Sequence, residues 1–238
     1  MCYHLLWNMI FMNKSTISLV IPAYNEGERL AVTLSAVDYD YFEEIIVVND
    51  GSRDQTLTVL KETEFKEYPL LVVNLSKNRG KGYAVWRGLQ AARGEVIVVA
   101  DADLKESINE VKKLIPPVVN GDCELSLAEI PIKAGGLGMV RLLADRGLQF
   151  ITGQRLRNPL SGQRCFKKGL IKEITPLSPG FGLEMGINIE LLKKGYRIKE
   201  IKTGIEHRIT SRDFSGFWHR WRQFCAILKT LIWKTLSD

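Results

Sequence analysis

The sequence has few of the residues that hold small secreted proteins together. Its four cysteines are too far apart in the chain for the paired spacing of a zinc ribbon or a disulfide framework. It also has no apolar run that approaches the roughly 20 residues that a membrane-spanning helix needs. We therefore expect a protein of a reducing compartment, namely the cytoplasm.

Other absences narrow the class further. No internal repeat, low-complexity segment or linker interrupts the 238 residues, of which 45% are hydrophobic and 25% are charged. This composition predicts one globular domain, which we place at 12–238. Residues 1–11 have no basic leader and no cleavage site, and they are either a start-codon artefact or a loose apolar arm. Nothing resembles a DNA-reading helix or an RNA-binding signature, so nucleic acid is not an expected partner.

The net charge of +6 is concentrated near the end of the chain. Between His207 and Lys234, six Arg and Lys residues stand against one acid, Asp213. Such an excess suits phosphate-bearing partners or an anionic membrane surface. Apolar residues also recur along one helical face of 213–238, with basic residues off that face. This segment is predicted to be a basic amphipathic helix that lies on a membrane or docks on its own domain.

The first half of the chain alternates between predicted strands and helices. The strands are TISLVIPA, EEIIVVND, YPLLVVNL and EVIVVA, and a helical pattern follows each of them. The helix after the fourth strand is marked by Ile108, Val111 and Leu114 or Ile115. Near-continuous apolar strands are typical of sheets buried on both faces. The sequence therefore predicts an α/β protein with a mostly parallel central sheet flanked by helices.

The second half is less regular. The glycine-rich stretch IPIKAGGLGMV, residues 130–140, is predicted to be a loop. The stretches NPLSGQRCFKK and GFGLEMGINIELLKKGYRIKEI are predicted to return the chain to the sheet, with a helix between the strands.

Polar clusters follow all four predicted strands. They are PAYNE at 22–26, NDGS at 49–52, NRGKG at 78–82 and DAD at 101–103. Each one alone could be a loop or a helix cap. Because ligands of parallel sheets bind beyond the carboxyl ends of the strands, four clusters at that edge predict a binding site.

The acidic triplet is the centre of the predicted site. Asp101 and Asp103 repel each other, and a divalent cation with oxygen ligands would offset that repulsion and could hold a diphosphate. Asp50 could accept a hydrogen bond from a nucleotide base or ribose, or it could cap the next helix. Lys81, between Gly80 and Gly82, suits a phosphate, and a solvated loop lysine is the alternative.

Four stretches together carry a family resemblance. LVIPAYNE, VVNDGSRDQT, GKGYAVWRGL and VVADADL resemble the nucleotide-sugar half of family 2-type glycosyltransferases with the GT-A fold, over residues 18–104. The resemblance implies a nucleotide-diphosphosugar donor and Mg²⁺ or Mn²⁺ held by Asp101 and Asp103. It implies a donor-binding half at 16–104 and an acceptor half at 105–212. The substrate-binding residues that it implies in the first half are Pro22, Tyr24, Glu26, Asp50, Lys81 and Asp101.

The second half is most similar to glucosyl-3-phosphoglycerate synthases, through NPLSGQRCF, GFGLEMGINIE and GIEHRI. That similarity implies transfer of glucose from UDP-glucose to a small phosphorylated acceptor. By the same similarity, Gly162 would bind substrate and Glu184 would meet the sugar hydroxyls. His207 would be the third metal ligand, and Arg208 would lie beside the phosphates or the acceptor. The implied catalytic residues are Asp103, Glu184 and Arg208.

Two departures leave the acceptor open. Those synthases carry Gly-Arg-Val-Thr near the acceptor phosphate, where this chain has Gly138-Met139-Val140-Arg141. Polyprenyl-phosphate sugar synthases share the first half and use a lipid acceptor, which would place the protein at the inner face of the membrane. They commonly have Gln where this chain has Lys105. The sequence predicts no oligomeric state.

Two other classes fit less well. A sugar-1-phosphate nucleotidyltransferase would have a glycine-rich loop ending in arginine where this chain has PAYNEGERL. A non-catalytic nucleotide-sugar binding protein would not need Asp101, Asp103 and His207.

Overall fold

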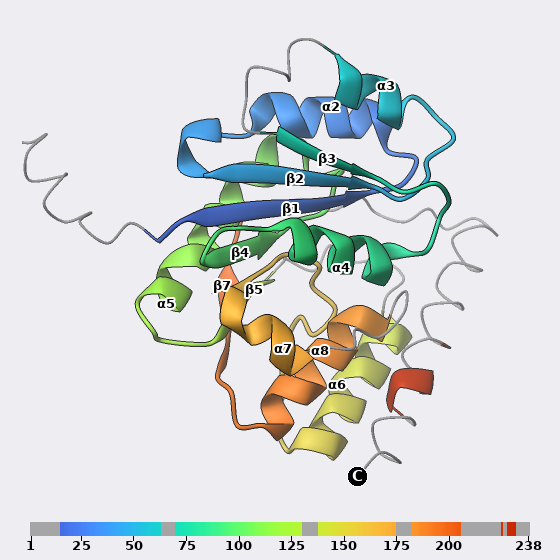
Figure 1. Ribbon diagram of the computed structural model, residues 1–238. Helices are drawn as coiled ribbons and strands as arrows, with labels where there is room; N and C mark the ends of the chain where they lie inside the picture. The colour runs from blue at the N-terminus through green and yellow to red at the C-terminus, as the bar shows by residue number, and fades with distance from the viewer. Residues whose placement is uncertain are drawn as a thin grey trace, which may run out of the picture.

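The computed structural model describes residues 15–62, 70–129, 138–174 and 182–205, together with Cys225 and residues 228–231. Within these ranges, seven strands form one sheet in the order β3-β2-β1-β4-β6-β5-β7 (Figure 1). The strands are β1 (Ile17–Ala23), β2 (Glu44–Asn49), β3 (Leu70–Asn74), β4 (Val96–Val99), β5 (Leu125–Glu129), β6 (Arg164–Lys167) and β7 (Ile198–Lys202). Strand β6 is antiparallel to β4 and β5, and the other neighbours are parallel. The predicted mostly parallel sheet is confirmed.

Helices cover both faces of this sheet (Figure 1). On one face lie α2 (Gly27–Ala36), α3 (Thr56–Lys61), α5 (Ile115–Val119) and the 3₁₀ helices η1 (Tyr39–Tyr41) and η3 (Lys105–Leu114). On the other lie α4 (Lys81–Ala91), α6 (Gly138–Thr152), α7 (Ile171–Ile174), α8 (Leu183–Lys193) and η4 (Lys168–Leu170). Side chains alternate along a strand, so Leu19 and Ile21 of β1 pack on the α2 side and Val20 packs on the α4 side. Strands β1, β2 and β4 are apolar on both faces because both faces are buried, whereas the edge strand β3 is only partly buried.

Two predictions about helices need correction. The segment after β4 is the 3₁₀ helix η3, followed by α5. Its buried residues Ile108, Val111 and Leu114 are three apart, which matches three residues per turn. The stretch 130–140 is not a loop throughout, because α6 begins at Gly138; residues 130–137 lie outside the described residues. The predicted strand, helix and strand of the second half are present as β6, α8 and β7.

Little of the predicted C-terminal helix at 213–238 is described, and that part docks on the domain. Residues 228–231 are helical, and Leu231 is buried against Gly147 of α6, where a Cβ would lie 2.4 Å from Leu231 Cδ1. This turn therefore fits the alternative of a helix docked on its own domain. None of the helices in the described ranges has the length and apolar character needed to cross a bilayer.

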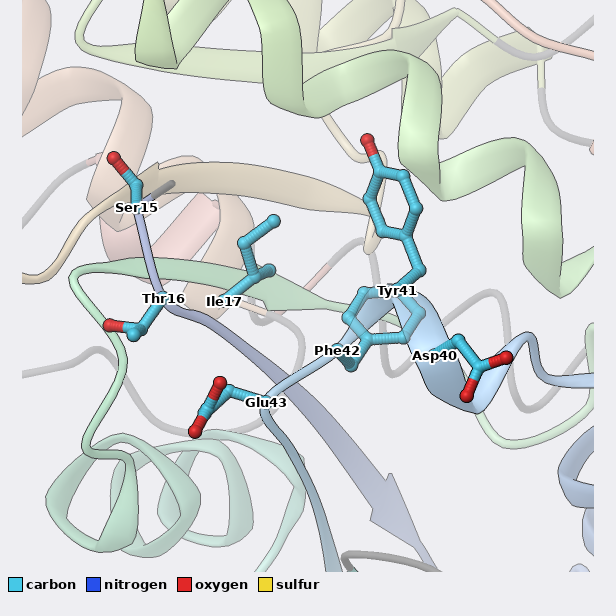
Figure 2. A pocket seen from close by; sticks show the side chains of 7 residues that line it. All are labelled: Ser15, Thr16, Ile17, Asp40, Tyr41, Phe42 and Glu43. Atoms are coloured by element: carbon cyan, nitrogen blue, oxygen red, sulfur yellow. The ribbon is translucent and has the colours of Figure 1, made fainter. Parts of the chain in front are cut away.

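A small pocket lies where β1 begins (Figure 2). Its lining comes from the start of β1 and from η1 with the residues that follow it, namely Ser15, Thr16, Ile17, Asp40, Tyr41, Phe42 and Glu43. The polar cluster at 22–26 follows the opposite end of β1. This pocket is therefore separate from the site that the sequence predicts.

The contact between α4 and β1 provides a test of this packing. A Cβ on Gly88 would lie 2.3 Å from Val20 Cγ1, so α4 can approach the sheet only with glycine here. We expect Gly88→Val to lower the free energy of unfolding by about 2 kcal/mol or more, because overpacking a core forces side chains and backbone apart. Urea denaturation measures the change.

Gly169→Ala is the matched control, since a Cβ on Gly169 would meet no atom within 4 Å. Its effect should stay within about 0.5 kcal/mol. Equal losses in the two variants would contradict the close helix–sheet contact.

Candidate active site

The loops that follow β1, β2, β3 and β4 meet at one edge of the sheet. These four strands are parallel neighbours, so their carboxyl ends lie side by side. The loops carry all four polar clusters of the first half. The structure thus brings the predicted donor-binding residues to one edge, as the strand pattern indicates.

Asp50 fixes the loop that leads into α4. The residue is 2% exposed, and its two carboxylate oxygens accept hydrogen bonds from the backbone N–H groups of Arg79 and Gly80, each at 2.8 Å. Gly80 has a φ of +90°, a conformation that favours glycine. Asp50 does not cap α3; the carboxylate of Asp54 accepts the backbone N–H of Thr56 there, at 3.0 Å. Asp50 therefore shapes the backbone directly before Lys81.

Lys81 joins the two halves of the chain. Its ammonium nitrogen lies 2.9 Å from Asp101 Oδ1 and 2.9 Å from Glu184 Oε1. Burial lowers the pKa of Lys81, but the two carboxylates outweigh burial and hold that pKa above its usual value. Lys81 is therefore a charged, paired residue and not a solvated loop lysine.

The other oxygen of Asp101 is held by the residue directly before β6. Gln163 is fully buried, and its Nε2 donates to Asp101 Oδ2 at 2.7 Å. A Cβ on the preceding Gly162 would lie 2.8 Å from both Asp101 Oδ2 and Lys81 Nζ. Glycine at 162 thus leaves the space that the Asp101–Lys81 pair occupies. Our sequence analysis missed Gln163, although it directly follows Gly162 in the stretch NPLSGQRCF.

Arg164 is a second residue that sequence analysis missed. It is 2% exposed in β6, and its Nη2 donates to the carbonyl of Ser161 at 2.6 Å. Burial lowers the pKa of Arg164, while the charges of Glu184 and Asp101 act in the opposite direction. Its Nη1 is buried with no hydrogen-bond partner in the described part of the chain. An arginine within a buried strand was the available signal, because arginine is seldom fully buried without a partner.

Asp103 has a different cation nearby. Arg29 of α2 is paired with Glu26. The hydrogen bond to Glu26 is the main cause that raises the pKa of Arg29, and the charge of Asp103 raises it further. Of the other predicted substrate-binding residues, Tyr24 is 42% exposed beyond the end of β1, and Pro22 lies within β1 opposite Val48.

Two of the three predicted metal ligands, Asp101 and Asp103, lie among the described residues. His207 and Arg208 lie outside them, and inside them no group of three or more His, Cys, Asp or Glu side chains could hold a metal ion. The donor chemistry of the two remaining predicted ligands does fit. Asp101 and Asp103 offer carboxylate oxygens, which Mg²⁺ and similar cations prefer. Lys81 and Gln163 each take one lone pair of an Asp101 oxygen, and each carboxylate oxygen has a second lone pair.

Comparison with known proteins agrees with this geometry. Residues 18–175 match the family model described as glycosyl transferase family 2. The dolichol-phosphate mannosyltransferase of Pyrococcus furiosus is 31% identical over 84% of this chain and 58% of its own length. The UDP-N-acetylglucosamine–dolichyl-phosphate N-acetylglucosaminyltransferase of Methanococcus voltae is 27% identical over 69% of this chain and 74% of its own. The chain thus spans less than two thirds of the Pyrococcus relative.

Solved structures with the same fold include glucosyl-3-phosphoglycerate synthase from Mycobacterium tuberculosis. Its complex with Mn²⁺, UDP and phosphoglyceric acid is 27% identical, with a TM-score of 0.74 over 93% of this chain and 78% of that chain. The complex with Mn²⁺, UDP-glucose and phosphoglyceric acid is 26% identical, with a TM-score of 0.72 over 92% of this chain and 80% of that chain. The predicted GT-A fold and both predicted groups of relatives are confirmed.

The Lys81 cluster predicts a measurable coupling. Lys81→Met leaves the carboxylates of Asp101 and Glu184 without the cation between them, so it should destabilise the protein. Adding Glu184→Gln removes one of the two charges and should recover part of the loss. Because Lys81 is partly exposed, we expect a coupling energy of about 1 kcal/mol from a double-mutant cycle in urea.

A surface pair of the same kind is the control. Lys199 and Asp122 lie 3.2 Å apart with side chains that are 48% and 50% exposed. The cycle of Lys199→Met and Asp122→Asn should give almost no coupling. Additive losses at Lys81 and Glu184 would mean that the ammonium does not join the two halves.

Proposed function

The chain belongs to glycosyl transferase family 2, and from that premise we propose that it transfers glucose from UDP-glucose to a small phosphorylated acceptor. The observation that carries this proposal is the cluster of Lys81, Asp101 and Glu184. It places a group from the donor-binding half against the start of α8 in the acceptor half. Reaction between a donor and an acceptor requires the two halves to meet at one point.

Each donor-side residue has a role in this proposal. Tyr24 and Glu26 border the nucleotide beyond the end of β1. Pro22 lies near the end of β1, shortly before them. Asp50 acts through the backbone of Arg79 and Gly80, because both of its oxygens already accept hydrogen bonds there. Gly162 leaves room for the groups that contact the diphosphate.

Charge governs the chemical step. A divalent cation bound by Asp101 and Asp103 would offset the negative charge that grows on the leaving diphosphate. Lys81 supplies a permanently charged ammonium at the same edge, and Arg208 would add a second cation from outside the described residues. Glu184 Oε1 accepts from Lys81 at 2.9 Å, and in this proposal the second carboxylate oxygen accepts from a sugar hydroxyl. With a hydroxyl acceptor, the same carboxylate could take up the proton.

A second function is favoured by the curated relatives. The enzymes of Pyrococcus furiosus and Methanococcus voltae are named for dolichol-phosphate and dolichyl-phosphate. We infer that a polyprenyl phosphate is the alternative acceptor, with transfer at the inner face of the membrane. The basic residues between His207 and Lys234 would then contact anionic lipid.

A panel of nucleotide sugars with Mn²⁺ tests the activity and separates the acceptors. Purified protein is incubated with each donor and with either phosphoglyceric acid or dolichyl phosphate, and products are identified by mass spectrometry. We expect glucose transfer from UDP-glucose to phosphoglyceric acid. Asp103→Asn should lower the rate by about a hundredfold, because the charge at the diphosphate is lost while the side-chain shape stays.

Asp122→Asn removes an exposed carboxylate elsewhere and should leave the rate unchanged. Transfer to dolichyl phosphate but not to phosphoglyceric acid would contradict the small phosphorylated acceptor and support the polyprenyl phosphate. Undiminished transfer in the presence of a chelator would exclude the metal role of Asp101 and Asp103.

A substitution at Gly162 tests whether turnover depends on the position of the Asp101–Lys81 pair. In Gly162→Ala the three atoms nearest the new Cβ belong to the side chains of Asp101 and Lys81, so side-chain and not backbone atoms have to move. The pair itself must shift, and we expect turnover to fall by about tenfold to a hundredfold with little change in melting temperature. Gly169→Ala serves again as the control. Full activity in Gly162→Ala would show that the position of the pair is not critical.

A further inference from the structure

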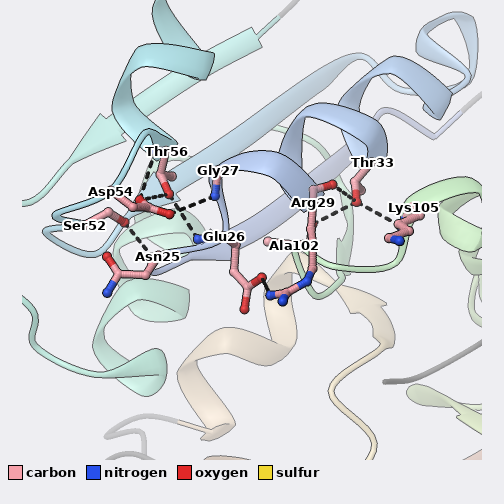
Figure 3. A network of polar contacts seen from close by, with 10 residues as sticks. All are labelled: Asn25, Glu26, Gly27, Arg29, Thr33, Ser52, Asp54, Thr56, Ala102 and Lys105. Carbon is pink, nitrogen blue, oxygen red and sulfur yellow. Dashed lines mark hydrogen bonds and ion pairs between the residues drawn. The ribbon is translucent and has the colours of Figure 1, made fainter. Parts of the chain in front are cut away.

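A threonine of α2 contacts the turn that carries the two aspartates. Thr33 is fully buried. Its Oγ1 lies 2.8 Å from the carbonyl oxygen of Ala102 and accepts the backbone N–H of Lys105 at 2.9 Å (Figure 3). These two backbone groups lie on either side of Asp103. One hydroxyl thus lies within hydrogen-bond distance of backbone groups directly before and shortly after that residue.

The turn needs such support. Lys105 has a φ of +50°, a left-handed conformation that costs a residue with a side chain about 1 kcal/mol or more. Ala102 and Leu104, on either side of Asp103, are buried and attach the turn to the core. Such apolar contacts do not set the direction of the Asp103 carboxylate. Hydrogen bonds do, because they fix the orientation of the peptide groups.

The helix that carries Thr33 is itself held at its first turn. The backbone N–H of Gly27 donates to Asp54 Oδ2 at 3.1 Å, and that of Glu26 donates to Thr56 Oγ1 at 3.1 Å (Figure 3). A Cβ on Gly27 would lie 2.9 Å from the backbone nitrogen of Thr56, so the two segments are in close contact. Helix α2 therefore connects the loop after β2 with the acidic turn after β4.

We propose that Thr33 is a positioning residue for Asp103. It sets the separation and direction of the two carboxylates and thereby the affinity of the pair for a divalent cation. This inference rests on the metal role in the proposed function. It adds that α2, far from the metal ligands in the sequence, determines their geometry.

A simpler role for Thr33 has to be distinguished. Its Oγ1 is also 2.9 Å from the carbonyl oxygen of Arg29, one helical turn earlier. Threonines in helices often donate to that carbonyl, and such a bond concerns the helix alone. A hydroxyl has a single proton, so Thr33 donates mainly to Arg29 or to Ala102. Whichever carbonyl receives the proton, Thr33 Oγ1 can still accept the backbone N–H of Lys105.

The test is a series of variants at this position, read out by Mn²⁺ binding. Free Mn²⁺ is measured by electron paramagnetic resonance, with and without UDP, so the readout does not depend on turnover. Thr33→Val keeps the shape and removes the hydroxyl, and we expect its Kd for Mn²⁺ to rise about tenfold. Thr33→Ser keeps the hydroxyl and should stay within twofold of the wild type. Thr33→Cys, with a weaker donor, should lie between them.

Ser126→Ala is the matched control. Ser126, in β5, is also fully buried, and its hydroxyl donates to the carbonyl of Leu114 at 2.6 Å. The variant should lower the melting temperature as Thr33→Val does but leave the Kd for Mn²⁺ unchanged. If Thr33→Val proves too unstable to purify, the Kd values for Mn²⁺ of Thr33→Cys and Thr33→Ser are compared instead. We expect Thr33→Cys to bind Mn²⁺ more weakly than Thr33→Ser.

The outcomes separate this inference from the proposed function. If the wild type binds Mn²⁺ and Thr33→Val binds it equally well, the positioning role is wrong and the metal role stands. The positioning role is also wrong if Ser126→Ala weakens binding as much as Thr33→Val. If the wild type does not bind Mn²⁺ even with UDP, both the positioning role of Thr33 and the metal role of Asp101 and Asp103 are overturned.

Discussion

The ammonium of Lys81, held between Asp101 and Glu184, is the interaction on which the site depends. A charge that is taken out of water is costly unless an opposite charge and hydrogen bonds replace the water. Asp101 follows β4, the last strand of the predicted donor-binding half, and Glu184 stands in the first turn of α8. Their common partner therefore fixes how the two halves meet. The role of Asp50 follows from this arrangement, because it shapes the loop that delivers Lys81.

The same interaction explains how two aspartates can stand so close together at the end of a buried strand. Lys81 is paired with Asp101, and Arg29 lies within the electrostatic reach of Asp103. Arg164 adds a buried positive charge behind Asp101 and Glu184. Side chains of the protein therefore supply positive charge that offsets part of this repulsion. The proposed metal would serve the chemistry of the diphosphate.

The family match spans the carboxyl edge of the first four strands and continues into the second half of the chain. The family model covers residues 18–175, which include all four loops at the carboxyl edge. Relatives named for dolichol-phosphate and structures solved with phosphoglyceric acid share this fold. One fold can support different acceptors when the residues around the second substrate differ. The shared fold is therefore compatible with either of the two proposed acceptors.

The sequence alone determined the four parallel strands of the first half, the helices that follow them and the loops that form the site. Apolar runs specify buried parallel strands, and parallel strands bring their carboxyl ends to one edge, so Asp50, Lys81 and Asp101 could be placed together.

Strand pairing between distant segments decided the rest. Gln163 and Arg164 reach the site only because β6 lies antiparallel beside β4, and no periodicity in the sequence encodes that neighbour. The contact of Thr33 with Ala102 likewise depends on how α2 packs over the end of β4. Such contacts join residues about 60 to 70 positions apart. They are set by tertiary packing, because a local sequence pattern extends over only a few turns of helix or one strand.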